Sequence, residues 1–268
     1  MFHKKTVKSC LCLLAAGILI LAFTGFNTPT KPKKQVLIVE RQHCVLQRAV
    51  GYIPSDEFDV GITIDVPVGG NPVLVDSVMG MLNKVLYNFF DDRIEHRFKP
   101  EVVYHSDGKS LVQHYREAYK AYICDTCSMY YEPFCCSEFH YLTVTMVEQT
   151  KKFVTYEVAK YFIAEGDCEY RYWVTFYADD GHRLSQVVKE GQVVDLLKHS
   201  AGTEYDVMED VGYRLAAGSD VSFRCDFGLT CDSLRCQYFY CPGVVDDIAF
   251  GMKTARPYLT EEARRLLE

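Results

Sequence analysis

The chain has 268 residues, of which 49% are apolar and 13% aromatic, enough for one large or two small domains with a sizeable core. Its first 34 residues hold six lysines and no acid, so the remainder carries 23 basic and 36 acidic residues, a net charge of −13. Such an acidic body argues against nucleic-acid binding, which needs a basic face, and permits attraction of a cationic partner.

Residues 1–27 have the pattern of an export signal. Three lysines precede an apolar run from Cys10 to Phe26, which is just long enough to cross a bilayer. No clear cleavage site follows, so a cleaved signal peptide and a signal anchor both stay open. Residues 28–35 form a Pro- and Lys-rich linker. We therefore predict an extracytoplasmic domain over residues 36–268, either in the periplasm or anchored in the cell envelope by an uncleaved N-terminal segment.

The first part of this domain predicts two strands and two long helices. A strand is predicted over 34–42. Apolar and polar residues alternate over Phe58–Val66, which is typical of a strand with one buried and one solvated face, and Pro67 is expected to end it. Asn71, followed by a proline and by apolar residues at helical spacing, predicts the N-cap of a helix. A second helix is predicted over 109–123.

The middle of the domain predicts a hairpin around which the rest is organised. β-Branched and aromatic residues fill its two arms, Phe153–Ile163 and Tyr170–Tyr177, and loop-forming residues 164–167 separate them. A further strand, Phe139–Glu148, leads into the first arm. We expect the hairpin to be the centre of an antiparallel sheet with helices packed on one face, which is an α+β fold.

The last third is expected to hold short elements. A short helix is predicted over 192–199 and a connection without regular structure over 204–218. A final strand is predicted over 248–254, followed by a helix that Thr260 caps.

Cysteines are numerous and even in number in the exported part, where ten of the twelve lie. An oxidising compartment makes disulfides the expected state. Two strands, Phe223–Phe227 and Leu234–Tyr240, predict a hairpin that places Cys225 opposite Cys236, at a separation that a disulfide accepts.

Four further cysteines, Cys124, Cys127, Cys135 and Cys136, are also disulfide candidates. Four thiolates in so short a stretch could instead hold zinc. The adjacent second pair and the oxidising compartment favour disulfides over a metal site, and the pairing itself does not follow from the sequence.

No motif of a known catalytic centre is present. The sequence has no His-Glu-x-x-His pair, no Gly-x-Ser-x-Gly elbow and no phosphate-binding loop. We therefore expect a non-catalytic domain without a cofactor or a metal. An enzyme whose site is assembled from distant residues stays an alternative.

Three stretches resemble the RsiV-like family, a domain of unknown function found in bacterial envelope proteins. They are Phe58–Phe90 with the run Asp65–Val75, the block Phe153–Leu184, and Gly228–Ala263. The resemblance covers most of residues 57–267. It implies an α+β domain with helices packed on an antiparallel sheet.

The resemblance also implies a class of partner. One member of the family is a membrane-spanning anti-sigma factor whose outer domain binds lysozyme, and others accompany peptidoglycan-modifying domains. A binding or sensing domain is therefore expected, with a basic protein such as lysozyme or cell-wall glycan as its partner. A peptidoglycan-modifying hydrolase and a purely structural envelope protein are the alternatives.

Two features depart from the family. A cytoplasmic sigma-binding domain is not expected here, because too few residues precede the apolar run to form one. A Gly-Gly-Ala-His-Gly-like loop of the family is replaced here by Ala164–Cys168, so a ligand role tied to that loop is not expected to carry over.

Overall fold

The computed structural model describes residues 36–49, 57–91, 102–129, 139–163, 167–200, 207–221, 225–241 and 244–268. All of them belong to one compact unit, Val36–Glu268. Within these residues no helix is both long and apolar enough to cross a bilayer. The predicted export segment and linker lie outside the described residues.

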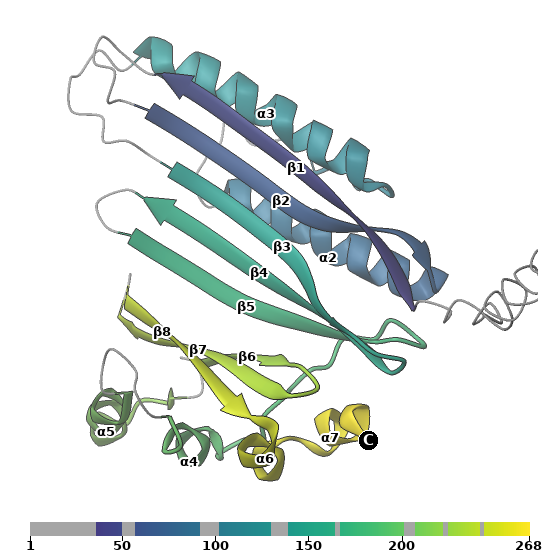
Figure 1. The fold of residues 1–268 in the computed structure, drawn as a ribbon. Coiled ribbons are helices and arrows are strands. Elements are labelled where there is room, and N and C mark those ends of the chain that lie inside the picture. Colours follow the sequence, from purple (N-terminus) through teal and green to yellow (C-terminus); the bar gives the residue numbers. More distant parts are fainter. Residues whose placement is uncertain are drawn as a thin grey trace, which may run out of the picture. The chain divides into compact units, whose positions relative to one another are not determined.

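A five-stranded sheet forms the larger part of the unit, with strand order β1-β2-β3-β4-β5 (Figure 1). Its strands are β1 (Leu37–Ala49), β2 (Glu57–Gly70), β3 (Phe139–Gln149), β4 (Phe153–Ile163) and β5 (Asp167–Tyr177). Three neighbouring pairs are antiparallel, whereas β2 and β3 run parallel. The predicted α+β class is confirmed, with a mixed sheet in place of a purely antiparallel one.

Two helices, α2 (Pro72–Asp91) and α3 (Gly108–Met129), connect the parallel strands and lie on the same side of the sheet (Figure 1). A parallel pair needs such a crossover because the chain must return to the end from which it started. The buried side chains of α2 and α3 form one core with the inward residues of the sheet. This core includes Leu74, Val78, Leu82, Ile62, Ile64, Leu142, Val144, Tyr156, Val158 and Val174.

Asn71 is the N-cap of α2, as predicted. Its Oδ1 accepts a hydrogen bond from the Val73 amide at 3.2 Å. The same side chain donates from Nδ2 to the carbonyl oxygens of Ala178 at 2.8 Å and Asp179 at 2.7 Å. One amide group therefore starts the helix and holds it to the turn that follows β5.

Strands β1 and β2 are longer than predicted. The sequence places the end of the second strand at Pro67, yet β2 continues to Gly70. Pro67 lies beside the register shift between Ile38 and Val39 of β1. A proline is tolerated there because the ladder of hydrogen bonds is already interrupted. The predicted hairpin arm Phe153–Ile163 is confirmed as β4. The hairpin that it forms with β5 lies at one edge of the five-stranded sheet, so the predicted central position is wrong.

A second, three-stranded antiparallel sheet has the order β6-β7-β8. Its strands are β6 (Cys225–Leu229), β7 (Ser233–Cys241) and β8 (Val244–Gly251). The helical elements of this part are α4 (Val193–Leu197), α5 (Val207–Ala216), α6 (Met252–Ala255), the 3-10 turn η3 (Arg256–Tyr258) and α7 (Glu261–Leu267). They share a second core with one face of this sheet. Thr260 caps α7 as predicted, since its side chain accepts from the Ala263 amide.

Two predictions for this region are wrong. The stretch predicted to be a connection contains α5, because Val207 and Val211, one turn apart, both bury against the second core. The predicted last strand ends earlier, at Gly251, and the chain then turns into α6.

The second sheet packs across β4 and β5 through small and hydroxyl-bearing residues. Thr155 Oγ1 donates to the Leu229 carbonyl oxygen at 2.8 Å and contacts Thr175 Oγ1 at 2.9 Å. Gly228 lies against the Trp173 ring, and a Cβ at this glycine would stand 2.3 Å from Trp173 Cγ. The two sheets can therefore pack closely at Gly228, because a glycine has no side chain to separate β6 from the Trp173 ring.

We expect Gly228→Ala to destabilise the protein by about 2–4 kcal/mol, because the new methyl group overlaps the Trp173 ring and forces β6 away from β5. Gly80→Ala is the matched control. Gly80 lies inside α2, and a methyl group added to it would meet nothing within 4 Å, so this change should be neutral or stabilising by up to about 1 kcal/mol. Urea unfolding of both variants measures the difference, and equal midpoints would contradict the packing described.

Alkaline pH should weaken the first core through Tyr115 of α3. This residue is 2% exposed, and burial raises its pKa to about 12 from the ordinary 10.0. A raised folded-state pKa stabilises the fold below pH 10 and loses that contribution as pH rises towards 12. Tyr115→Phe should therefore reduce the fall in unfolding free energy over this range by about 1–2 kcal/mol. Unfolding of both proteins at pH 9 and pH 11.5 measures it, and equal losses would contradict the assignment.

Candidate functional site

The face of the five-stranded sheet opposite α2 and α3 is covered by no described helix over β1 to β4 (Figure 1). We call it the open face. Strand registers place its side chains in three rows that run across the sheet. Its residues are Arg41, His43, Val45, Gly61, Thr63, Asp65, Tyr141, Thr143, Thr145, Glu157, Ala159 and Tyr161.

The aromatic row runs from Gly61 through Tyr141 to Tyr161. Both tyrosines are half-buried, and their ring centroids lie 6.2 Å apart with a 41° tilt between the planes. Gly61 permits this arrangement, because a Cβ there would stand 2.5 Å from Tyr141 Cδ1. The Tyr141 ring therefore lies across the neighbouring strand, where its apolar surface is partly open to solvent.

The middle row is made of small residues. Thr63, Thr143 and Ala159 are directly opposed on β2, β3 and β4. His43 continues the row on β1, and its Nδ1 lies 2.8 Å from Thr63 Oγ1. These side chains provide hydroxyl and imidazole groups beside the tyrosine rings without filling the space above them.

The third row carries charges that are already engaged. Arg41 Nε and Nη2 donate to the Asp65 carboxylate at 2.8 and 3.0 Å. Asp65 is only 5% exposed and also accepts from the Met146 amide at 3.1 Å, just beyond the point where β2 and β3 stop pairing. Glu157 accepts from Trp173 Nε1 at 3.1 Å. Both carboxylates therefore have structural partners, which does not favour a role as catalytic acid or base.

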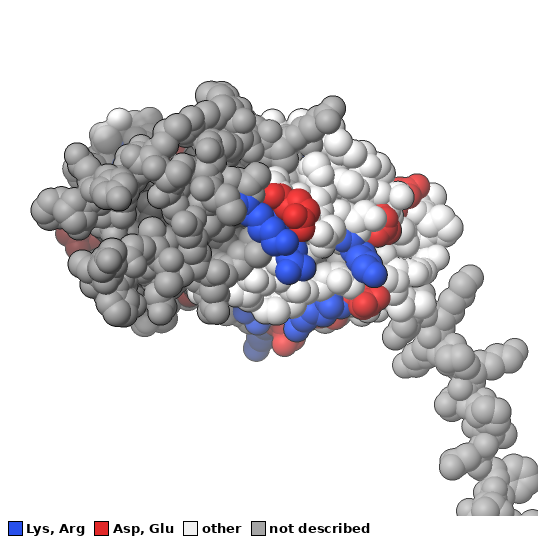
Figure 2. Space-filling model, turned by 90° about the horizontal axis from the view of Figure 1, so that it is seen from above, with Lys and Arg blue, Asp and Glu red and all other residues white. Residues whose placement is uncertain are grey.

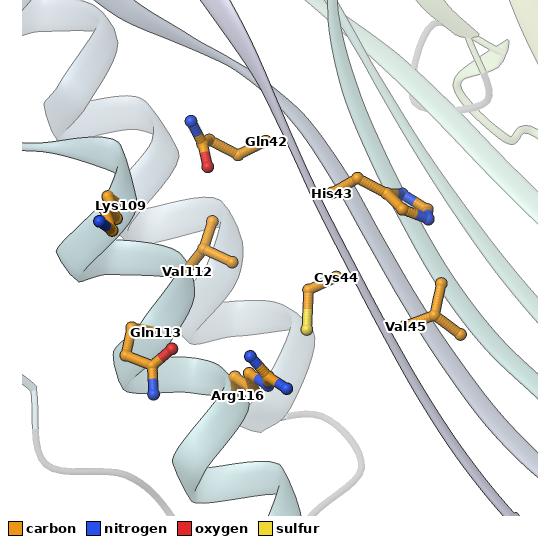
Figure 3. A pocket seen from close by; sticks show the side chains of 8 residues that line it. All are labelled: Gln42, His43, Cys44, Val45, Lys109, Val112, Gln113 and Arg116. Atoms are coloured by element: carbon orange, nitrogen blue, oxygen red, sulfur yellow. The ribbon is translucent and has the colours of Figure 1, made fainter.

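A hollow of about 370 Å³ lies between β1 and α3. Four consecutive residues of β1, Gln42 to Val45, form one wall, and α3 forms the other with Lys109, Val112, Gln113 and Arg116. Figure 3 shows Gln42 and Cys44 directed towards α3, whereas His43 and Val45 project to the other side of the strand. Burial raises the pKa of the Cys44 thiol, and the charge of Arg116 partly opposes that rise.

Charges on the described surface are mixed. Figure 2 shows basic and acidic side chains intermingled on the part of the molecule described in that view, without a region of a single sign. The acidic excess of the sequence is therefore not gathered on this side into a surface suited to a cationic partner.

The structure places the predicted cysteine pair close together, although in a different register. Cys225 pairs with Tyr238, and Cys236 pairs with Phe227. The predicted direct opposition is thus wrong by two residues, because the turn closes between Thr230 and Ser233 with Leu229 opposite Leu234. The two thiols are nevertheless diagonal neighbours on one face and are close enough to hydrogen bond.

The other cysteine candidates are less defined. Cys124 and Cys127 lie within α3, which continues to Met129 and not only to the predicted residue 123. No glycine or proline interrupts the helix there. Cys135 and Cys136 lie outside the described residues. Among the described side chains, Cys44, Cys225, Cys231 and Cys236 are free thiols, and no group of His, Cys, Asp or Glu is arranged to hold a metal ion.

No protein-family model and no curated protein matches the chain. A solved structure of a DUF3298 family member from Bacteroides fragilis is similar, with a TM-score of 0.55 and 14% identity over 85% of this chain and 96% of that chain. The chain has the fold of the DUF3298, or RsiV-like, family. A DUF3298 family protein from Pseudomonas aeruginosa gives a TM-score of 0.47 at 14% identity over the same shares. The RsiV-like fold predicted from sequence is confirmed.

Sequence reasoning did not single out the open face. Tyr141 and Tyr161 occupy the positions that alternate with core residues on β3 and β4, so they read as ordinary outward residues. Their neighbourhood depends on the parallel pairing of β2 with β3, which places Gly61 beside Tyr141. A glycine within an alternating strand was the one available signal of a close contact.

Oxidation of the native protein should link Cys225 to Cys236, because their thiols are already in contact. Burial and the neighbouring Cys225 raise the pKa of Cys236, so its reactive thiolate is scarce at neutral pH and the linkage should form faster as pH rises above 9. Peptide mapping without reductant measures it. Cys236→Ser should abolish the linked peptide and Cys231→Ser should preserve it; linkage through Cys231 in the native protein would contradict the geometry.

Proposed function

We propose that the protein is a non-catalytic binding domain of the bacterial cell envelope that binds cell-wall glycan on its open face. The observation that carries this proposal is the Tyr141–Tyr161 pair, whose half-buried rings lie beside a strip of threonines. Sugar rings have apolar faces and hydroxyl edges, so flat aromatic groups next to hydroxyl donors and acceptors suit them.

The charges of the open face favour glycan over a strongly basic protein. Arg41 and Asp65 form an ion pair, and Glu157 is engaged by the Trp173 indole. The described side chains of the face therefore carry an excess of only one negative charge, that of Glu157, which offers little attraction to a cation such as lysozyme. The resemblance of the sequence to the RsiV-like family implies an envelope protein, and the export pattern of the N-terminal sequence supports the same location.

Co-sedimentation of the full-length chain with purified insoluble peptidoglycan tests the proposal. We expect Tyr161→Ala to weaken retention by about threefold to tenfold, because it removes one of the two tyrosine rings of the face. Tyr161→Phe should keep most of the binding. Tyr213→Ala is the control, since Tyr213 is a 74% exposed tyrosine on α5 and outside the open face.

Three outcomes would contradict the proposal. The first is no sedimentation with peptidoglycan, and the second is equal binding by Tyr161→Ala and Tyr213→Ala. The third is retention of lysozyme at low salt without retention of glycan, which would favour a basic protein as the partner. Release of soluble glycan fragments during the assay would instead indicate a hydrolase.

A further inference from the structure

The two edges of the five-stranded sheet differ in how they are covered. At the β5 edge, the Arg171 amide donates to Gln237 of the second sheet, and the chain at Arg183 forms a bridge to Phe176. At the other edge, β1 pairs with β2 alone, and among the described residues no backbone group lies hydrogen-bonded to its outer side. An uncovered edge can accept another strand.

Within residues 37–45 of β1, the features that discourage strand addition all lie before Gln42. The register shift lies between Ile38 and Val39, and the charged Glu40 and Arg41 follow. The next four residues, Gln42 to Val45, are free of charged lysine, arginine, aspartate and glutamate and continue in regular register with β2. Bulges and charges usually protect an edge strand from pairing with another strand. Both are absent from Gln42 to Val45, the segment of β1 that lines the hollow.

The hollow beside this segment has a basic lining. Lys109 and Arg116 of α3 contribute to it, and no carboxylate does. Within the described residues neither cation forms an ion pair. Glu40 of β1 and Glu117 of α3 accept hydrogen bonds from two lining amides, Gln42 Nε2 at 3.0 Å and Gln113 Nε2 at 2.7 Å. Glu117 also forms an ion pair with Lys120 at 3.1 Å. Among the described residues neither acid is paired with Lys109 or Arg116, so these two cations stay available to a bound carboxylate.

We propose that β1 and α3 together bind an extended acidic segment of a partner polypeptide, which adds to the outer edge of β1 at Gln42 to Val45. A strand added there lies about 4.8 Å from β1, and every second side chain points to the helix layer. Figure 3 shows Lys109 and Arg116 on α3, on that side of β1. A carboxylate on the added strand would meet one of these two cations there. This site is separate from the open face and does not depend on glycan binding.

Fluorescence anisotropy with labelled hexapeptides tests the proposal on the full-length chain. The probes alternate threonine with glutamate, threonine with lysine, or threonine with glutamate and methyl groups on alternate backbone nitrogens. We expect the acidic peptide to bind at least about tenfold more tightly than the basic one, because of the two free cations. The N-methylated peptide should bind at least about tenfold more weakly than its parent, because it cannot complete the ladder of backbone hydrogen bonds.

Variants of single lysines and arginines locate the site. Arg116→Gln and Lys109→Gln should each weaken the acidic peptide by about threefold to tenfold, and added salt should reduce the difference. Lys84→Gln is the matched control, because Lys84 is exposed on α2 and outside the lining of the hollow. Its effect should stay within about twofold.

The proposal is overturned if the acidic and basic peptides bind alike, if N-methylation has no effect, or if Arg116→Gln and Lys84→Gln give the same affinity. It is also overturned if β1 pairs with a second copy of the chain and excludes the peptide, which sedimentation over a range of protein concentrations would show. Loss of glycan binding in Tyr161→Ala with peptide binding unchanged would keep the two sites distinct.

Discussion

The parallel pairing of β2 with β3 is the constraint on which the rest of the architecture depends. Because the chain must travel back along the sheet between these strands, α2 and α3 are placed on one face and bury it. The other face meets the second sheet at β4 and β5, and no described helix covers it over β1 to β3. One topological choice therefore separates a face that two helices bury from a face that these helices leave uncovered.

This separation explains why polar and small residues are tolerated in the middle of a sheet. Asp65 is nearly buried, yet it has a guanidinium and a backbone amide as partners at the point where two strands part. The side-chain hydroxyl groups of Thr155 and Thr175 form a hydrogen bond with each other beneath the second sheet. Gly61 and Gly228 each allow a large ring to lie on the strand that carries them. Close contact is obtained from missing side chains on one face and from tightly packed apolar ones on the other.

The helices and strands were largely predictable from the sequence, whereas the pairing of each strand with its neighbours in the sheet was not. The arm Phe153–Ile163 alternates so regularly that its strand follows directly, and Asn71 and Thr260 have the side chains that cap helices. The parallel pairing is not encoded in such a pattern, because alternation does not specify which strand lies alongside. The turn before Ser233 moved the Cys225 register by two residues for the same reason. The open face and the hollow depend on how the elements pair and pack, and Gly61 within an alternating strand was the one local signal of a close contact there.

The two hydrogen bonds from the Asn71 side chain also bear on the order of folding. They join Asn71 to Ala178 and Asp179, which lie 107 and 108 positions further along the chain. Closing so long a loop costs entropy before any contact repays it, whereas the turns of α2 form locally. Helix α2 is therefore expected to form first, and its attachment to the turn after β5 is expected to form later. Asn71 would then join the first and second halves of the polypeptide at a late stage of folding.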